Sequence, residues 1–313
     1  MKKIEVELTK HNLLEVQDTL TFLGSCFSEH MADSTIDLAF NVISNPFGVI
    51  FNPISLAEQL NSNEEEWRSS IFQSDDKFLS WNASSIIWGL DRGSVESELS
   101  NQRQRLFDHI RKSSVLFITF GSAWVYELKK EDKIVANCHK QSRQIFNKRC
   151  LTAKEIVAKW KLTLENVKRL NPELKVVFTV SPVRHKKDGL VENTLSKAHL
   201  ISAVHEIIVS QESCFYFPSY EIVIDELRDY SYFEKDGVHP NKYAIEEVED
   251  RFLKSMLSYD AQSVIQDFLK IKSLASHRLI HRGSRSAAQH IKDTQEKVDQ
   301  FLSKHPGFEK LLK

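Results

Sequence analysis

The fold is decided by the stretch at residues 20–29, LTFLGSCFSE. Its first part, Leu20–Leu23, is a short β-prone run that ends at Gly24, and a helical pattern begins within the next few residues. A short run of this kind is typical of a strand that is covered on both faces. Glycine permits the tight backbone turn that such a strand needs at its end. The stretch therefore predicts a buried strand that passes directly into a helix.

The same alternation continues along the chain. Further strands are predicted at Val115–Phe120, Val176–Val180 and Cys214–Phe217. Ser84–Trp88 is a weaker candidate, for which part of a helix is the alternative. Helical patterns occupy Ser28–Phe40, Ser100–Lys112, Ala153–Leu170, Leu195–Ser210 and Tyr243–Leu257. Strands and helices that alternate in this way predict a mostly parallel sheet of about five strands with helices on both faces, which is a three-layer α/β/α fold.

One segment interrupts the alternation. Two β-like stretches, Trp124–Leu128 and Ile134–His139, flank the charged segment Lys129–Lys133, and together they predict a β-hairpin. Because this segment directly follows the strand Val115–Phe120, we expect the hairpin to project over the carboxyl edge of the sheet. Ligands of open α/β sheets usually bind at that edge.

Composition excludes several classes of protein. The 313 residues include 42 Lys and Arg and 43 Asp and Glu, so the net charge of −1 does not support a nucleic-acid-binding protein. No apolar run approaches the ~20 residues of a membrane span, which predicts that the chain has no membrane partner. No apolar segment follows Lys2 and Lys3, so a signal peptide is not indicated and we expect a cytoplasmic protein.

The cysteines give no sign of a structural metal site. The four are widely spaced and form no C-x-x-C pair; they are Cys26, Cys138, Cys150 and Cys214. Zinc sites of the common kinds need such pairs, and disulfides are rare in the cytoplasm. We therefore expect free thiols, no bound metal and no cofactor.

The pattern changes beyond Tyr259. Ser273–Ala288 has little apolar content and predicts a linker or solvated tail; it contains His277, Arg278, His281, Arg282, Gly283 and Arg285. Gln289–Leu302 predicts a peripheral helix. From Ala261 to Lys313 there are ten Lys and Arg against five Asp and Glu, so this end is basic. We expect one catalytic-type domain at residues 1–258 and a basic linker with a helix at 259–313, and we favour a solvated tail over a contact with an anionic partner.

The turn at Gly24-Ser25-Cys26 is the first candidate for chemistry. Residues at the start of a helix lie beside free N–H groups and the positive end of the helix dipole. This setting lowers the pKa of a cysteine and favours a reactive thiolate, and the same N–H groups can form an oxyanion hole. The alternative is structural: Ser25 caps the helix and Cys26 is a small buried residue. Taken alone, the turn favours the structural interpretation.

The second candidate is the segment at residues 236–241, DGVHPN. A D-x-x-H turn brings the carboxylate of Asp236 to the ring of His239, where it would fix the tautomer and stabilise the imidazolium. Pro240 disfavours helix at His239, and Asn241 suits the cap of the helix that follows. The alternative is an ordinary loop with a surface histidine.

Polar loops that follow the predicted strands form the third set. Any one of them has a structural explanation, but parallel strands bring their carboxyl ends to one edge, so several such loops meet there. The residues singled out are Gly48, Asn52, Gly121, Trp124, Asn137, His139, Arg184 and His185.

These segments together resemble one known family. GSCFS at Gly24–Ser28 closely matches the G-S-C-F-A signature of the GSCFA domain family, with Ser28 in place of the alanine. Further matching segments are NPFGVIFNP from Asn45, NCHK from Asn137, SPVRH from Ser181, YFPSYEI from Tyr216 and DGVHP from Asp236. The resemblance covers roughly residues 20–258.

The GSCFA family is in turn similar to the SGNH/GDSL hydrolases, which have a flavodoxin-like α/β/α fold. Those enzymes hydrolyse or transfer ester-linked acyl groups, often on carbohydrates or lipids. Their first block, F-x-G-D-S-L, implies that Cys26 stands at the nucleophilic serine and Ser25 at the aspartate. Their last block, D-x-x-H, implies Asp236 and His239. Gly48 corresponds to the glycine of the second block, which helps to bind the oxyanion.

One block departs from the pattern. The third block, G-x-N, falls on Gly121-Ser122-Ala123, so its asparagine is absent. The loss of one oxyanion donor costs ~10²–10³ in rate in a serine hydrolase. Asn137, His139 or Asn52 could replace it.

The resemblance implies an esterase or acyltransferase with Cys26 as nucleophile, His239 as general base and Asp236 orienting it; Ser25 is the rival nucleophile. Arg184 and His185 would bind a polar or anionic part of a small-molecule or carbohydrate ester. No metal, cofactor or nucleic acid is implied, and the oligomeric state is left open. The alternative function is a binding module without turnover, for which the absent asparagine argues.

Overall fold

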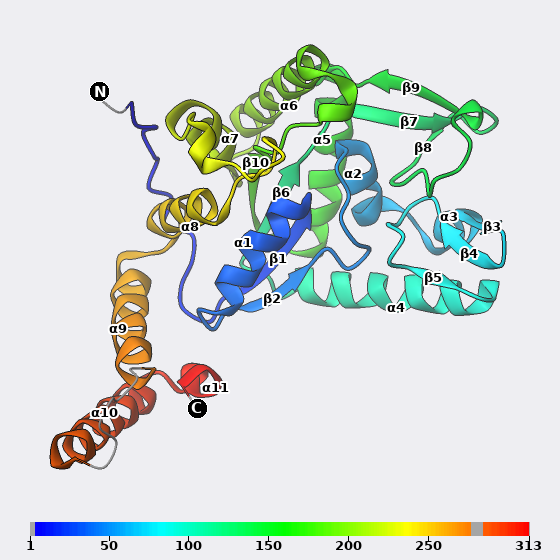
Figure 1. Cartoon of the computed structure of the whole chain (residues 1–313). Helices are drawn as coiled ribbons and strands as arrows, with labels where there is room; N and C mark the ends of the chain where they lie inside the picture. The colour runs from blue at the N-terminus through cyan, green and yellow to red at the C-terminus, as the bar shows by residue number, and fades with distance from the viewer. Residues whose placement is uncertain (1–3, 277–283, 313) are drawn as a thin grey trace.

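The computed structural model describes residues 4–276 and 284–312 and contains a central five-stranded sheet (Figure 1). All of its strand pairs are parallel. The strands are β1 (Thr19–Gly24), β2 (Asn41–Ser44), β6 (Val115–Phe120), β10 (Lys175–Val180) and β11 (Cys214–Tyr216), in the spatial order β11-β10-β6-β1-β2. Counted along the chain, this is the order 2-1-3-4-5 of flavodoxin-like folds, whose topological switch point lies between β1 and β6.

Four of the predicted strands are confirmed almost to the residue, and β6 matches its prediction at both ends. The fifth strand was wrong. Ser84–Trp88 contributes no strand to the central sheet, and the edge position belongs instead to β2. The sequence of β2, NVIS, has only four residues and two of them are polar, so it carried little β signal.

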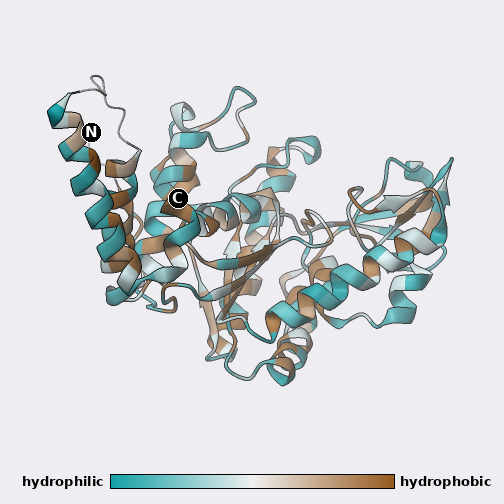
Figure 2. Ribbon diagram, turned by 90° about the horizontal axis from the view of Figure 1, so that it is seen from below, coloured by the Kyte–Doolittle hydropathy of each residue, from teal (hydrophilic) through white to brown (hydrophobic). Residues whose placement is uncertain are grey.

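Helices cover both faces of the sheet and give the expected three layers. One face packs under α2, α4, α5 and α6, and the other under α1, α8 and α9. Their bounds are α1 (Cys26–Ile36), α2 (Pro53–Asn61), α4 (Arg92–Ile110), α5 (Ala153–Leu170), α6 (Leu190–Ser210), α8 (Lys242–Met256) and α9 (Tyr259–Ala275). Figure 2 shows the strands of the central sheet as largely hydrophobic.

Neighbouring residues of one strand enter opposite cores, as the pleat requires. In β6, Leu116 and Ile118 belong to the core under α4, α5 and α6, whereas Val115 and Phe117 belong to the core under α1 and α8. This two-sided burial explains why the strand reads as a continuous apolar run.

Two small antiparallel sheets lie to one side of the central one, on the right in Figure 1. The predicted hairpin is confirmed as β7 (Trp124–Leu128) and β8 (Lys133–Ile134), and β9 (Phe146–Cys150) adds a third strand on the other side of β7. The second small sheet was not predicted. It consists of β3 (Ile71–Ser74), β4 (Lys77–Ser80) and β5 (Trp88–Gly89), and the short helix α3 (Glu64–Ser69) precedes it.

The C-terminal region is helical, as expected. After α9 come α10 (Arg285–Lys304) and α11 (Glu309–Leu312), and in Figure 1 α9 and α10 extend away from the sheet. The predicted linker, Ser273–Ala288, was too long at both ends, because α9 runs to Ala275 and α10 begins at Arg285. His277, Arg278, His281, Arg282 and Gly283 of that prediction lie outside the described residues. Phe268, Phe301 and Phe308 pack together and join this region to the core under α8.

Three short elements lead from β11 to α8. They are α7 (Ser219–Glu221), a π-helical turn at Ile222–Glu226 and a 3-10 turn at Tyr230–Tyr232. In the described ranges no helix is both long and apolar enough to cross a bilayer.

The end of β1 has the tightest backbone contact of the sheet. Gly24 has a φ of +145°, and a Cβ atom added there would lie 2.3 Å from the carbonyl oxygen of Thr119 in β6. Only glycine therefore allows β1 and β6 to pair up to this point and the chain to turn into α1.

We predict that Gly24→Ala destabilises the protein by about 3 kcal/mol or more, because it adds both backbone strain and a clash that only a strand shift relieves. Gly189→Ala is the matched control, since Gly189 also has a positive φ, +89°, but its added Cβ would meet no atom within 4 Å. The control should cost about 1–2 kcal/mol. Urea unfolding of both variants measures the difference, and equal losses would contradict the role given to Thr119.

Candidate active site

The turn after β1 is held by contacts from three neighbouring segments. The Gly24 N–H donates to Asn45 Oδ1 at 2.8 Å, and the Ser25 N–H donates to the Thr119 carbonyl at 3.3 Å. The Gly24 carbonyl accepts from the Ile50 N–H at 3.1 Å. Asn45 is buried and has a φ of +40°, so its side chain is fixed beside the turn. These bonds place Ser25 and Cys26 at the switch point between β1 and β6.

Ser25 is the N-cap residue of α1, but its side chain makes no capping hydrogen bond. It is 1 % exposed, and its Oγ has no hydrogen-bond partner in the described part of the chain. A buried hydroxyl without a partner is costly and therefore uncommon. The structural alternative for Ser25, a capping role, is not what the structure shows.

Cys26 is the first residue of α1 and is partly buried. Burial raises the pKa of its thiol, which outweighs the opposite effect of the Phe27 N–H and of the Lys197 ammonium. The prediction that the helix N-terminus leaves Cys26 with a lowered pKa was therefore wrong. The N–H groups do favour the thiolate, but removal of the sulfur from water disfavours it more.

Asp236 and His239 form the predicted pair. His239 Nδ1 lies 2.6 Å from Asp236 Oδ2, while Asp236 Oδ1 accepts from the backbone N–H groups of Val238 and His239. The Val238 N–H and then the His239 ring lower the pKa of Asp236 to about 2. Asn241 caps α8 as expected, since its Oδ1 accepts from the Ala244 N–H. The carboxylate thus fixes which ring nitrogen of His239 is left for chemistry.

The pair does not contact the turn directly. No hydrogen bond joins His239 to Ser25 or Cys26 among the residues described, and about half of the His239 side chain is exposed. The charge of His239 instead acts on the pKa of His185, and so does the charge of Lys197. Burial, followed by the charge of Lys197, lowers the pKa of His185 to about 4, so this ring is neutral at pH 7.

Lys197 is a residue of this site that the sequence reasoning missed. It comes from α6, is 1 % exposed, and donates from Nζ to the carbonyls of Gly121 at 2.7 Å and Ser181 at 2.6 Å. Burial lowers its pKa to about 7, whereas the charge of Cys26 acts to raise it. Helical spacing could have revealed it, because Lys197 stands on the buried face of α6 with Asn193, Leu200 and Val204.

The two predicted oxyanion glycines do not offer free donors. The Gly48 N–H donates to the Asn45 carbonyl at 2.7 Å, and the Gly121 N–H donates to the Phe51 carbonyl at 2.8 Å. The Ser122 N–H donates to the same Phe51 carbonyl at 3.0 Å. Because these backbone groups are already paired, both glycines hold loops at the sheet edge rather than stabilising an oxyanion. The donors left at the turn are those at the start of α1.

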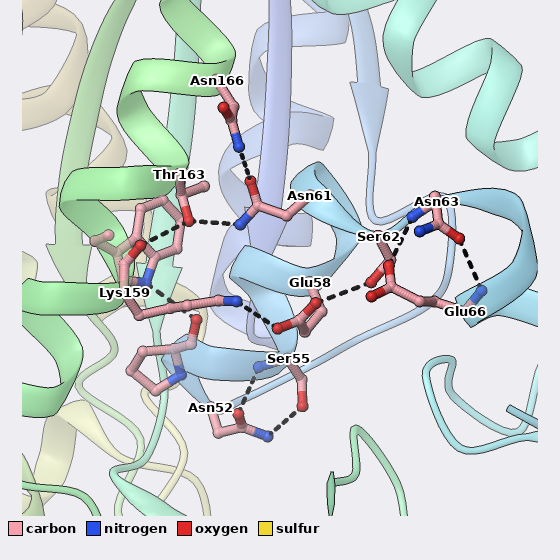
Figure 3. Close-up of polar contacts among 12 residues, drawn as sticks. Asn52, Ser55, Glu58, Asn61, Ser62, Asn63, Glu66, Lys159, Thr163 and Asn166 are labelled. Atoms are coloured by element: carbon pink, nitrogen blue, oxygen red, sulfur yellow. Dashed lines mark hydrogen bonds and ion pairs between the residues drawn. The ribbon is translucent and has the colours of Figure 1, made fainter.

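Asn52 serves a helix rather than the site. As Figure 3 shows, its side chain caps α2, with Oδ1 accepting from the Ser55 N–H at 2.8 Å and Nδ2 donating to Ser55 Oγ. Figure 3 also shows α2 tied to α5 through the Glu58–Lys159 ion pair and the bond from Asn61 to Thr163. Asn52 is therefore not the group that replaces the absent asparagine.

His139 is also structural. It is buried beside Trp81 and Phe72, and its ring nitrogens contact the Ser80 carbonyl at 2.8 Å and Ser85 Oγ at 3.1 Å. Burial lowers its pKa. Both ring nitrogens are thus engaged in joining the β7–β9 sheet to the β3–β5 sheet, so His139 is not the group that replaces the absent asparagine either.

Three of the remaining predicted residues, Trp124, Asn137 and His185, line a cleft of about 350 Å³ beneath the hairpin. Phe51, Asn52, Trp124, Asn137, His185 and Asp188 are among its lining residues. The Asn137 side chain accepts from the His139 N–H, and the Trp124 indole donates to the Glu192 carbonyl at 3.3 Å. Arg184 lies outside the cleft, with its guanidinium 5.0 Å from the centre of the Phe233 ring. His185 lines this cleft and is also the residue whose pKa the charge of Lys197 lowers.

No group of three or more His, Cys, Asp or Glu side chains suited to a metal ion occurs within the described ranges.

Comparison with known proteins identifies a family. The family model described as "GSCFA family" matches residues 19–252, which is about three quarters of the chain. No curated protein shows significant similarity to the chain. The matched region begins at β1 and ends in α8, so it contains every residue of the site described above.

The buried lysine has a measurable consequence. Its pKa is about 7 when folded and 10.5 for an ordinary lysine, so between these values the unfolded chain binds one proton more. The free energy of unfolding should therefore rise with pH in this interval. We predict that the wild type gains about 1 kcal/mol per pH unit relative to Lys197→Met from pH 7 to 9, and that the difference levels off below pH 7. Urea unfolding at several pH values tests this, and parallel curves would contradict it.

Proposed function

The chain belongs to the GSCFA family, and from that premise and the geometry of the site we propose that it is an acyl-ester hydrolase or acyltransferase of the SGNH/GDSL kind. The observation that carries the proposal is the placement of Ser25 and Cys26 at the switch point of the sheet, where two residues that could be nucleophiles meet the N-terminus of α1. Open α/β sheets bind and transform their ligands at this place.

Cys26 is the proposed nucleophile. Its sulfur would attack the ester carbonyl carbon and form a thioester, and the N–H groups at the start of α1 would stabilise the negative charge that develops on the carbonyl oxygen. Ser25 remains the rival, since its buried Oγ has no partner in the described chain. The resemblance to the GDSL block supports Cys26.

The Asp236–His239 pair would move the protons of the alcohol and of water. His239 gives a proton to the alcohol that leaves, and as general base it later takes one from the water or acceptor alcohol that attacks the thioester. Its half-exposed position suits groups that arrive from solvent, and the Asp236 carboxylate holds the ring through Nδ1.

An acylated carbohydrate is the proposed substrate class. The cleft beneath the hairpin combines the aromatic side chains of Phe51, Trp124 and Tyr126 with the polar groups of Asn137 and Asp188. Apolar walls with a few placed polar groups are typical of small-molecule sites. The acyl group would then lie toward Cys26, and the sugar toward the hairpin.

A binding module without turnover is the second candidate. It is favoured by the paired N–H groups of Gly48 and Gly121 and by the absence of the third-block asparagine. A fluorophosphonate or thiol-directed activity probe separates the two: labelling at Cys26 or Ser25 that requires His239 supports the enzyme, and no labelling of the folded protein supports the binding module.

We predict that the wild type hydrolyses p-nitrophenyl acetate and that Cys26→Ala and His239→Ala each lower kcat/KM about 10²-fold or more, because nucleophile and proton transfer are lost. Asp236→Asn should act in the same direction as His239→Ala. Cys150→Ala, at a thiol on β9, is the matched control and should retain wild-type rates. If Cys26→Ala keeps full activity while Ser25→Ala loses it, the nucleophile is Ser25; if both keep it, the proposal fails.

A further inference from the structure

Lys197 is the buried ionisable group whose surroundings the proposed function leaves unexplained. Its Nζ lies between the carbonyls of Gly121 and Ser181, the residues that follow β6 and β10. β6 is also the neighbour of β1, whose carboxyl end leads into Cys26. The amine is therefore fixed at the carboxyl edge of the sheet, where β6 and β10 end.

The hydrogen bonds of Lys197 match a neutral amine better than an ammonium ion. A neutral amine has two N–H donors and one lone pair, and the two carbonyls take up both donors. An ammonium ion would have a third donor, for which the described residues offer no hydrogen-bond partner. No carboxylate of the described chain lies within ion-pair distance of Nζ either. A buried charge without a partner is costly, whereas both N–H donors of the neutral amine are satisfied.

We propose that Lys197 is the base that takes the thiol proton of Cys26, so that the two residues act as a cysteine–lysine pair. The inference rests on the proposed function, because it gives the nucleophile of that function its proton acceptor. It also explains why His239, which contacts neither Cys26 nor Ser25, is free to serve the alcohol and water.

Electrostatics link the two side chains. The charge of each acts on the pKa of the other, and burial lowers the pKa of Lys197 to about 7, so a large fraction of this lysine is neutral at physiological pH. Nζ and Sγ are not hydrogen-bonded in the structure. Catalytic hydrogen bonds of this kind commonly shorten when substrate is bound.

The proton balance closes over one cycle. In acylation the S–H bond of Cys26 breaks and its proton joins Lys197, the sulfur bonds to the carbonyl carbon, the ester C–O bond breaks, and the alcohol takes a proton from the His239 imidazolium. In deacylation His239 takes a proton from water, the resulting hydroxide attacks the thioester, the C–S bond breaks, and the thiolate recovers its proton from the Lys197 ammonium. Both residues return to their starting states.

The experiment measures the alkylation rate of Cys26 by iodoacetamide from pH 5.5 to 10, followed by mass spectrometry of the peptide that contains Cys26. This readout needs no substrate, so it stands apart from the test of esterase activity. In the wild type we expect a step near pH 7, where the lysine becomes able to accept the proton. Lys197→Met and Lys197→Arg should lack this step and react roughly tenfold more slowly at pH 8, because neither side chain accepts a proton. Lys154→Met, at an exposed lysine of α5, should follow the wild type.

Circular dichroism and thermal unfolding accompany each variant. If Lys197→Met is folded and less stable but retains the step near pH 7, Lys197 only joins strand ends and the inference is overturned. If Lys197→Met does not fold, the wild type and Lys197→Arg decide: a wild-type profile with a single ionisation above pH 8.5, or an Arg variant that keeps the step, overturns it as well.

Discussion

The rest of the structure depends on the close approach of the Gly24 backbone to Thr119 at the carboxyl ends of β1 and β6. This contact lets β1 pair with β6 up to Gly24, the last residue of β1, and turns the chain into α1 at once. It therefore sets where Ser25 and Cys26 stand. The loop that follows β2 is fixed on the same point, because Asn45 and Ile50 both bond to Gly24. The backbone thus determines the position of the proposed nucleophile before any catalytic side chain is considered.

Burial sets the chemistry at this point. The Cys26 thiol is shifted toward its neutral form, and Lys197 toward its neutral amine, by the same cause, removal from water. When the Cys26 thiol and the Lys197 amine are both neutral, neither places a charge in the protein interior. One proton transfer between them produces a thiolate and an ammonium ion. The Asp236–His239 pair is the polar counterpart, since about half of each of its side chains is exposed to solvent. We therefore assign the proton transfer of the buried thiol to Lys197. The proton transfers to the alcohol and from water are assigned to the more exposed His239.

Much of the fold could be predicted from the sequence, because two-sided burial leaves continuous apolar runs such as Val115–Phe120. The edge strand β2 could not be predicted, since it has only four residues, two of them polar, and so shows no hydrophobic periodicity. Within the site, the Asp236–His239 pair follows from its three-residue spacing. Lys197, the pairing of the Gly48 and Gly121 N–H groups, and the structural engagement of His139 depend on contacts between segments far apart in sequence. Helical spacing indicates that Lys197 is buried, but no local pattern shows which groups these residues contact.

The central claim is that Cys26 carries an acyl group during turnover. The most direct measurement is rapid quenching of the protein with an excess of activated acetyl ester, followed by mass spectrometry of its peptides with and without neutral hydroxylamine, which cleaves thioesters much faster than oxygen esters. The account predicts an added acetyl group on the peptide that contains Cys26, removed by hydroxylamine and absent from Cys26→Ala. A hydroxylamine-resistant acetyl group on Ser25, or no acetyl group on this peptide during turnover, would contradict it.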